Sequence, residues 1–179
     1  ALVYPMTGFY QRAADLMQSQ IGKNNLFAAL NLDGAAYISN WAPDEMEAIK
    51  WLRQAPRGII VEAVGGSYTE YARYSTFSGQ ATVLGWPGHE SQWRGGEKEK
   101  GSREADIALL YRTNNWNEAQ EILTRYQIRY IVVGPREKAT YQMASNKFQM
   151  YLPAVYSNNS VAIYEVPVEI TGSSSGEIN

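Results

Sequence analysis

The sequence contains no cysteine and a single histidine. Without cysteine the chain has no disulfide, no thiol nucleophile and no thiolate that binds a metal. Protein zinc sites take three or four ligands from His, Cys and carboxylates, so one His predicts that no metal ion is held. Gly65-Gly66-Ser67 is not followed by the Gly-Lys-Ser/Thr of a P-loop and does not form the G-x-G-x-x-G pattern. We therefore expect no cofactor.

An excess of positive charge is also missing. The chain has 16 Lys and Arg against 18 Asp and Glu, a net charge of −2, so nothing is available to neutralise a phosphate backbone and no nucleic-acid partner is expected. No segment approaches the roughly 20 consecutive apolar residues of a membrane helix. No charged region followed by an apolar one opens the chain, as it would in an export signal. The first residues, Ala-Leu-Val-Tyr-Pro, include no Met, and we expect a piece of a longer protein, with N-terminal processing as the alternative.

The 179 residues that are present suit one domain, and 45% of them are hydrophobic, enough to bury a core. Aromatic residues are plentiful, with 13 Tyr and 5 Trp. A Tyr or Trp ring combines a flat apolar body with a polar group, which suits surfaces that contact sugars, lipid headgroups or other proteins. For most individual rings we nevertheless expect a place in the core.

Apolar runs alternate with helical patterns along the chain. Nearly continuous apolar runs at 59–64, 81–84 and 128–133 are typical of strands covered on both faces. Helical patterns begin at Pro43, Tyr68 and Asn115, another helix is expected with Ser102 as its cap, and a single helix is expected from Arg136 to Phe148. A hairpin is expected around Asn158-Asn159. This predicts an α/β three-layer sandwich with a mostly parallel sheet, helices on both faces and an antiparallel C-terminal edge hairpin.

The same pass divides the chain into three parts. Residues 1–42 are expected to pack on the core and are a candidate membrane-proximal link. Residues 43–168 form the α/β domain, and the Ser- and Gly-rich residues 169–179 form a flexible tail.

Ligands of open parallel sheets bind beyond the carboxyl ends of the strands, where three loops are expected, at 65–73, 85–94 and 134–137. The second loop holds the richest chemistry. A His beside a Glu suits general acid–base work, and Trp and Arg are enriched where binding energy concentrates. The alternative is a loop folded on its own Trp rings. The predicted binding residues here are Trp86, His89, Glu90, Gln92, Trp93 and Arg94.

Glu62 lies inside an otherwise apolar strand. A buried carboxylate needs a partner, and Arg73, Arg94 and Arg103 are the candidates for an ion pair. We place Glu62, Tyr68 and Arg73 in a second rim of the binding site, with a structural ion pair as the alternative. No catalytic residue is assigned, because Ser67 lacks the G-x-S-x-G elbow and nothing fixes the distance between Glu62 and Glu90.

At these residues the sequence resembles the C-terminal part of the DUF2298 family, the very hydrophobic "YYY" membrane proteins of Chloroflexi and archaea. The resemblance runs from about Leu32 to Val166. It is carried by Leu32-Asp33-Gly34, Val61-Glu62-Ala63, Val83-Leu84-Gly85-Trp86, His89-Glu90, Gln92-Trp93-Arg94, Tyr130-Ile131-Val132-Val133-Gly134-Pro135 and Glu137.

The resemblance implies a polytopic parent protein with many N-terminal membrane helices and this part facing the extracytoplasmic side of the cell membrane. Similarity to GT-C-like glycosyltransferases implies sugar transfer from a polyprenyl-phosphate carrier. In that architecture the catalytic carboxylate lies between membrane helices, which this sequence does not include. The implied partners are the membrane-embedded part of the same polypeptide and a lipid-linked sugar or glycan.

Three hypotheses follow from the sequence. In the first, the chain is an accessory or substrate-contacting domain of a membrane glycosyltransferase and is inactive alone. In the second, it is a stand-alone hydrolase that uses His89 and Glu90. In the third, the loop that contains them is a rigid plug that docks on the membrane part.

Overall fold

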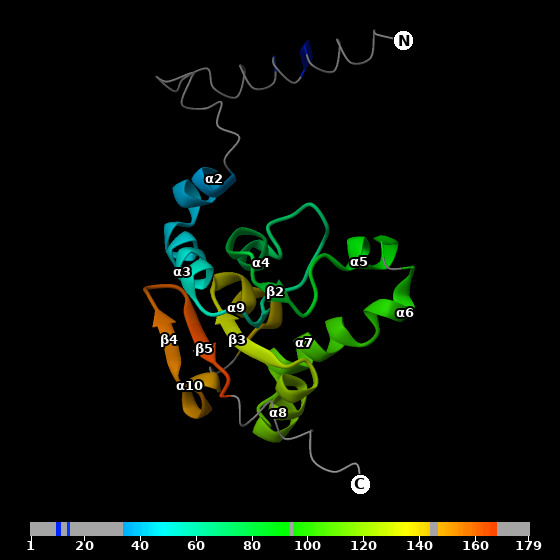
Figure 1. Ribbon diagram of the computed structural model, residues 1–179, viewed down its shortest axis with the longest axis vertical. Coiled ribbons are helices and arrows are strands. Elements are labelled where there is room, and N and C mark those ends of the chain that lie inside the picture. Colours follow the sequence, from blue (N-terminus) through cyan, green and yellow to red (C-terminus); the bar gives the residue numbers. More distant parts are fainter. Residues whose placement is uncertain (1–9, 12–13, 15–33, 94, 144–146, 168–179) are drawn as a thin grey trace.

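The computed structural model describes residues 34–93, 95–143 and 147–167, together with residues 10, 11 and 14. A five-stranded sheet lies at its centre, in the order β2-β1-β3-β5-β4 (Figure 1). The strands are β1 Ile59–Val61, β2 Ala81–Thr82, β3 Ile128–Val133, β4 Ala154–Ser157 and β5 Ala162–Glu165. β2, β1 and β3 are parallel, and the β4–β5 hairpin adds to β3 in the antiparallel direction.

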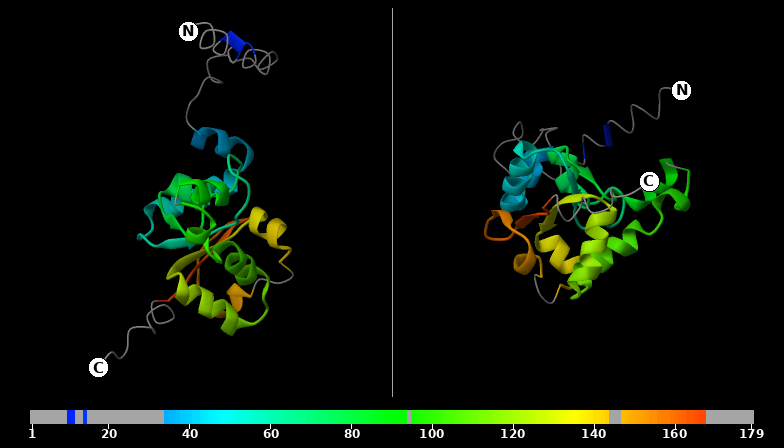
Figure 2. Two further views of the ribbon diagram at one scale, coloured as in Figure 1. Left: turned by 90° about the vertical axis from the view of Figure 1, so that its right-hand side faces the viewer. Right: turned by 60° about the horizontal axis from the view of Figure 1, so that its bottom comes forward.

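Helices cover both faces of this sheet (Figure 2). One core cluster joins one face to α2 Gly34–Trp41, α3 Pro43–Gln54 and α4 Arg73–Ser78. A second cluster joins the opposite face to α7 Arg103–Arg112, α8 Trp116–Arg125, α9 Pro135–Tyr141 and α10 Phe148–Tyr151. Two further helices, α5 Pro87–Trp93 and α6 Glu97–Lys100, lie on the β2 side of the molecule. The predicted three-layer α/β fold is therefore confirmed.

Strand β3 shows why the apolar runs form the centre of the sheet. Ile131 and Val133 enter one core cluster, whereas Tyr130 and Val132 enter the other. Successive side chains of a strand point to opposite faces, so a strand that is covered on both faces needs apolar residues throughout. The continuous run at 128–133 meets this requirement, and the observed strand has these bounds.

Local signals set most of the remaining boundaries. Helix α3 begins with Pro43 followed by Asp44 and Glu45, and α4 ends at Gly79, whose φ of 75° is the left-handed conformation that glycine adopts without strain. In the hairpin, the side-chain carbonyl of Asn158 accepts hydrogen bonds from two backbone N–H groups three or fewer residues ahead.

Three expectations about local structure were wrong. The polar segment after Trp86 is helical from Pro87, because proline suits the first turn of a helix. The Ser102 hydroxyl donates to the carboxylate of Asp106 at 2.8 Å and does not cap its helix. The single helix expected from Arg136 to Phe148 is divided into α9 and α10.

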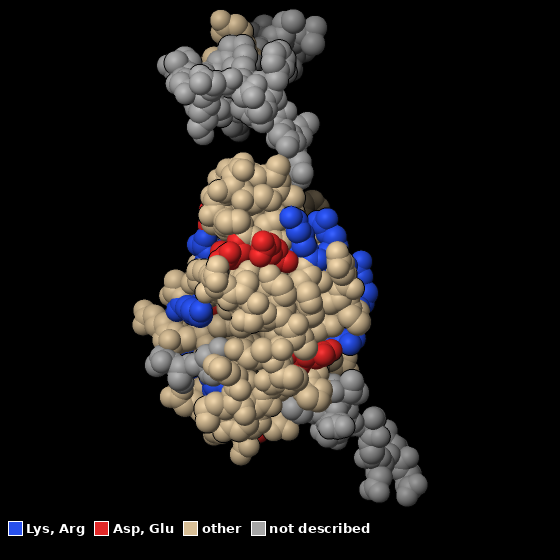
Figure 3. Space-filling model, turned by 90° about the vertical axis from the view of Figure 1, so that its left-hand side faces the viewer, with Lys and Arg blue, Asp and Glu red and all other residues tan. Residues whose placement is uncertain are grey.

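Charged side chains are a minor part of one face of the molecule (Figure 3). On the face shown in Figure 3 uncharged side chains cover most of the area, and acidic and basic groups occur next to one another. Among the described helices, none has the length and apolar character needed to cross a bilayer.

Candidate functional site

A surface cavity of about 310 Å³ opens between α4 and α5. Helix α4 and the residue before it contribute Ala72, Ser75 and Thr76, and the segment after β2 contributes Gly85 and Trp86. Helix α5 contributes His89, Glu90 and Trp93. The cavity is thus on the β2 side of α4, beyond the carboxyl end of the sheet, and it gathers four of the residues predicted from the sequence.

Aromatic rings form one wall of this region. The His89 ring lies edge-on to Tyr68 and Trp86, with ring centroids 4.6 and 5.3 Å away, and the Trp86 indole N–H donates to the backbone carbonyl of Tyr71 at 2.8 Å. This hydrogen bond fixes the Trp86 ring against the loop that follows β1. Tyr68 and Trp93 remain 80% and 78% exposed, so both rings offer large faces to a ligand.

The geometry of α5 does not favour an acid–base pair of His89 and Glu90. They are consecutive residues of α5, and side chains one position apart on a helix point in different directions. The His89 Nε2 atom is buried and has no hydrogen-bond partner among the described residues. The arrangement therefore favours a ring that shapes a binding surface over a ring that relays protons.

The crevice between β1 and β3, where the strand order reverses, is where ligands of open sheets usually bind. Here the chain fills it with the buried side chain of Glu137, whose two oxygens accept the backbone N–H groups of Ala63 and Gly134, each at 2.9 Å. Burial raises the pKa of Glu137 above its usual value. The Glu137 carboxylate therefore takes the N–H groups that a ligand would bind at these strand ends. The open cavity lies nearer to β2.

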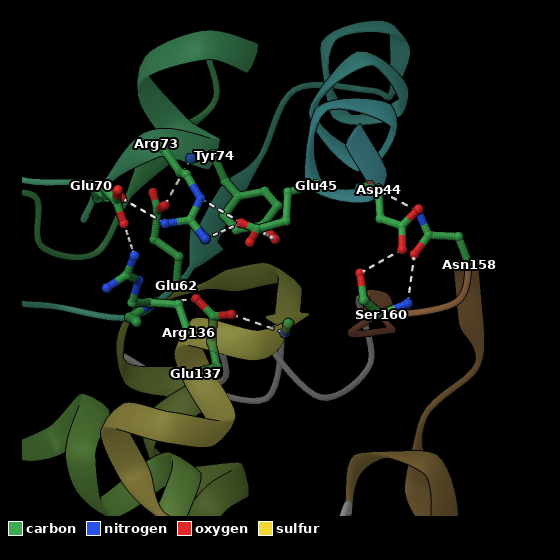
Figure 4. Close-up of polar contacts among 12 residues, drawn as sticks. Asp44, Glu45, Glu62, Glu70, Arg73, Tyr74, Arg136, Glu137, Asn158 and Ser160 are labelled. Carbon is green, nitrogen blue, oxygen red and sulfur yellow. Dashed lines mark hydrogen bonds and ion pairs between the residues drawn. The ribbon is translucent and has the colours of Figure 1, made fainter. Parts of the chain in front are cut away.

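Glu62 lies beneath helix α4 and not in the cavity (Figure 4). Its two oxygens accept the backbone N–H groups of Tyr74 at 2.9 Å and Ser75 at 3.0 Å. Complete burial raises the pKa of Glu62 to about 7. The expected ion pair with Arg73 was wrong, because unpaired N–H groups at the start of a helix are good partners for a carboxylate and need no guanidinium.

Arg73 pairs instead with the buried carboxylate of Glu45, which also accepts the Tyr74 hydroxyl at 3.1 Å. The Arg73 guanidinium donates to the backbone carbonyl of Glu70 at 2.9 Å and packs over the Trp41 ring. With 5% of its surface exposed, Arg73 has no access to a ligand. Its place in the binding rim is therefore wrong, and its contacts join α2, α3 and the loop before α4.

A further contact ties two of the three loops together. The Glu70 carboxylate forms an ion pair with Arg136 at the start of α9, and the Arg136 guanidinium lies over the Tyr71 ring at 5.2 Å (Figure 4). Together with the Trp86 hydrogen bond, this contact links the loops that follow all three parallel strands. The loops beside the cavity are therefore connected to one another.

The predicted site residues have different places in the structure. Trp86, His89, Glu90 and Trp93 line the cavity, and Tyr68 packs against two of them. Gln92 is on α5 and exposed but does not line the cavity, and Arg94 lies outside the described residues.

Sequence reasoning missed Ser75 and Thr76, which line the cavity from α4, and the burial of Glu45. Glu45 shares the helical spacing of the buried Ala48, Ile49 and Leu52, so its burial was readable. No comparable signal marks Ser75 and Thr76. In the described part of the chain no group of three or more His, Asp or Glu residues is placed to hold a metal ion.

No protein-family model matches the chain, and no curated protein matches it. Among solved structures, the chain is similar to the C-terminal globular domain of oligosaccharyltransferase from Archaeoglobus fulgidus. The identity is 14%, the TM-score is 0.45, and the match covers 69% of this chain and 97% of that chain. The resemblance to the DUF2298 family therefore stays a hypothesis.

Proposed function

We propose that the cavity between α4 and α5 binds carbohydrate. The observation that carries this proposal is the combination of aromatic rings with polar side chains around a cavity of about 310 Å³. Apolar C–H faces of a sugar ring stack on Trp and Tyr rings, and its hydroxyls need donors and acceptors nearby. Trp86 and Trp93 supply the rings, while Ser75, Thr76 and Glu90 supply polar groups.

The larger context of the proposal comes from the sequence. The resemblance described above supports a parent protein in which this domain faces the extracytoplasmic side of a membrane and contacts the substrate of a GT-C-like glycosyltransferase. In that parent the donor is a lipid-linked sugar, and the membrane-embedded part of the polypeptide is the partner. The domain contributes binding, and the chemistry belongs to the membrane part.

Stand-alone glycoside hydrolysis is less well supported by the geometry. Glycosidases commonly place two carboxyl groups across the scissile bond. Among the described residues that line the cavity, Glu90 is the one carboxylate, and both oxygens of Glu62 are bonded to amides beneath α4. We therefore expect the isolated chain to bind sugars without turning them over.

The proposal predicts that Trp93→Ala weakens carbohydrate binding by about five- to thirtyfold, because a stacked ring contributes on the order of 1–2 kcal/mol. Isothermal titration of the chain with oligosaccharides of mannose, glucose, galactose and N-acetylglucosamine measures this. Met150→Ala is the matched control, since both side chains are 78% exposed and Met150 does not line the cavity. Absence of binding to every series, or equal binding by the Trp93→Ala variant, contradicts the proposal.

A further inference from the structure

The wall of the cavity that α4 supplies begins in an unusual backbone conformation. Ala72, the residue before α4, has a φ of 61°, a left-handed conformation that residues with a side-chain carbon rarely adopt. Such a conformation persists only where surrounding contacts hold it in place. Ala72, Ser75 and Thr76 all line the cavity. The shape of this wall therefore depends on the contacts that hold the start of α4.

Glu62 supplies such contacts from beneath the helix (Figure 4). Its carboxylate accepts the backbone N–H groups of Tyr74 at 2.9 Å and Ser75 at 3.0 Å, and the Ser75 side chain forms a further hydrogen bond with it. Ser75 thus contacts the buried carboxylate and also lines the cavity. Glu62 is 2% exposed and does not line the cavity itself, so it acts on a ligand only through α4.

Charged and titratable side chains from four helices surround Glu62. They are Glu45 on α3, Arg73 and Tyr74 on α4, Tyr111 on α7 and Glu137 on α9. Arg73 is paired with Glu45, and the negative charge of Glu137 disfavours a second charge on Glu62. Burial and, to a smaller extent, Glu137 raise the pKa of Glu62 to about 7. Glu62 therefore changes its charge within the pH range in which binding is measured.

Ionised and protonated Glu62 hold the helix differently. A carboxylate accepts hydrogen bonds at both oxygens, whereas a protonated carboxyl group donates from one of them. The proton removes a buried charge and so stabilises the fold, but it also takes one acceptor away from the N–H groups of Tyr74 and Ser75. The start of α4, with its left-handed Ala72, is then held by fewer hydrogen bonds.

We propose that Glu62 is a positioning residue of the cavity: its ionised carboxylate fixes the start of α4 in the position that binds carbohydrate, and its protonation weakens binding. This inference rests on the proposed carbohydrate-binding function and adds a pH dependence to it. Linkage is reciprocal, so a ligand that prefers the ionised form also lowers the proton affinity of Glu62.

The pH profile of binding provides the first test. Calorimetric titration with the uncharged oligosaccharide that binds best, from pH 5 to 9, is expected to show an affinity about tenfold higher at the alkaline end. Glu62→Gln keeps the size of the side chain but cannot ionise, so it should bind weakly and lose this rise. His89 and Glu90 line the cavity and are unaltered in this variant, so their share of the profile remains.

Glu47→Gln, on the exposed side of α3, is the matched control and should keep the full rise in affinity with pH. If Glu62→Gln shows the same rise as the unaltered chain, the pH effect belongs to other groups and the inference is wrong.

A second measurement needs no variant. In a ¹H–¹⁵N correlation spectrum the amide signals of Tyr74 and Ser75 report the ionisation of Glu62, with a midpoint expected at about pH 7 in the free chain. Saturating oligosaccharide should lower this midpoint by about one pH unit, the same factor of ten expressed as proton binding. A carboxylate with a purely structural role would titrate alike in the free and bound chain.

The outcomes separate the inference from the proposed function. Binding with an unmoved midpoint overturns the positioning role of Glu62 and leaves the cavity as a carbohydrate site. Failure of every sugar to bind overturns the proposed function and this inference together.

Discussion

Three buried carboxylates surround the carboxyl end of β1, and each is stabilised by a different partner. Glu45 pairs with the guanidinium of Arg73, whereas Glu62 and Glu137 accept backbone N–H groups. For Glu62 and Glu137, hydrogen bonds from neutral amides only partly offset the loss of hydration on burial. Glu62 and Glu137 therefore have raised pKa values.

The raised pKa of Glu62 makes folding stability depend on pH. The folded pKa of about 7 lies above the ordinary pKa of 4.5, so the folded state holds the proton more tightly than the unfolded state. The contribution of Glu62 to the free energy of unfolding is fully present below pH 4.5. It is lost as the pH rises through about 7, and the free energy of unfolding then decreases by about 3 kcal/mol. Denaturant unfolding at pH 4 to 8 measures this decrease.

Substitution isolates the share that belongs to Glu62. Glu62→Gln cannot titrate, so the free energy of unfolding of this variant should fall less across the same range, even though it starts lower because an amide replaces one acceptor oxygen. Glu47→Gln on the exposed face of α3 is the control and should keep the full pH dependence. If the free energy of unfolding falls equally with pH in Glu62→Gln and in the unaltered chain, ionisation of Glu62 does not destabilise the fold and the prediction is wrong.

At the scale of elements, a buried lysine holds the end of α7. Lys147, at the residue before α10, donates from Nζ to the backbone carbonyls of Leu110 at 2.6 Å and Tyr111 at 3.2 Å, and it is 5% exposed. These carbonyls lie in the last turn of α7, where backbone acceptors have no partner within the helix and a cation is favoured by the helix dipole. Lys147 thereby connects α7 to α10.

Removing this connection should destabilise the fold. Lys147→Met keeps the length of the side chain but leaves two buried carbonyl groups without a donor, which should lower the free energy of unfolding by about 2–3 kcal/mol. Lys138→Met is the control, because Lys138 is exposed on α9, and it should change stability by less than about 0.5 kcal/mol. Equal effects of the two substitutions in denaturant unfolding would contradict a capping role for Lys147.

The elements also show which parts of the structure could be predicted. Strand β3 was predicted with the bounds that it has, because a continuous apolar run that ends at a Gly-Pro pair is typical of a buried strand. Helix α5 was not, because Gly85, Pro87 and Gly88 are typical of a turn. Pro87 suits the first turn of a helix as well as a turn, and this first turn packs closely against the loop after β1, where a side-chain carbon at Gly88 would lie 3.0 Å from the Ser67 hydroxyl. Contacts of this kind leave no local pattern in the sequence.

The candidate site was predicted only in part, because local composition can be read from the sequence and tertiary contacts cannot. The density of aromatic and polar residues marked the segment from Trp86 to Trp93, and four of its residues line the cavity. The partner of Glu62 could not be found in this way, because backbone N–H groups carry no sequence signal. Its pairing with α4 became visible only when the fold brought the helix start onto the strand end.

At the scale of the whole molecule, the chain closes one ligand position and opens another. Glu137 occupies the crevice between β1 and β3, while contacts through Tyr71 and Trp86 connect the loops that surround the cavity on the β2 side. The site therefore lies at an end of the sheet where side-chain contacts hold the loops together. A ligand that binds there should affect the residues between α4 and α5 and leave the α3 side of the molecule unchanged.

The central claim is that carbohydrate binds between α4 and α5, and the five tryptophans of the chain allow it to be tested directly by NMR. Each indole N–H gives a separate signal in a ¹H–¹⁵N correlation spectrum, and the chain is titrated with the oligosaccharide that binds best. We expect the signals of Trp86 and Trp93 to shift with one binding curve, while those of Trp41, Trp51 and Trp116, which do not line the cavity, stay in place. Shifts confined to the latter three, or no shift at saturating oligosaccharide, would contradict a carbohydrate site between α4 and α5.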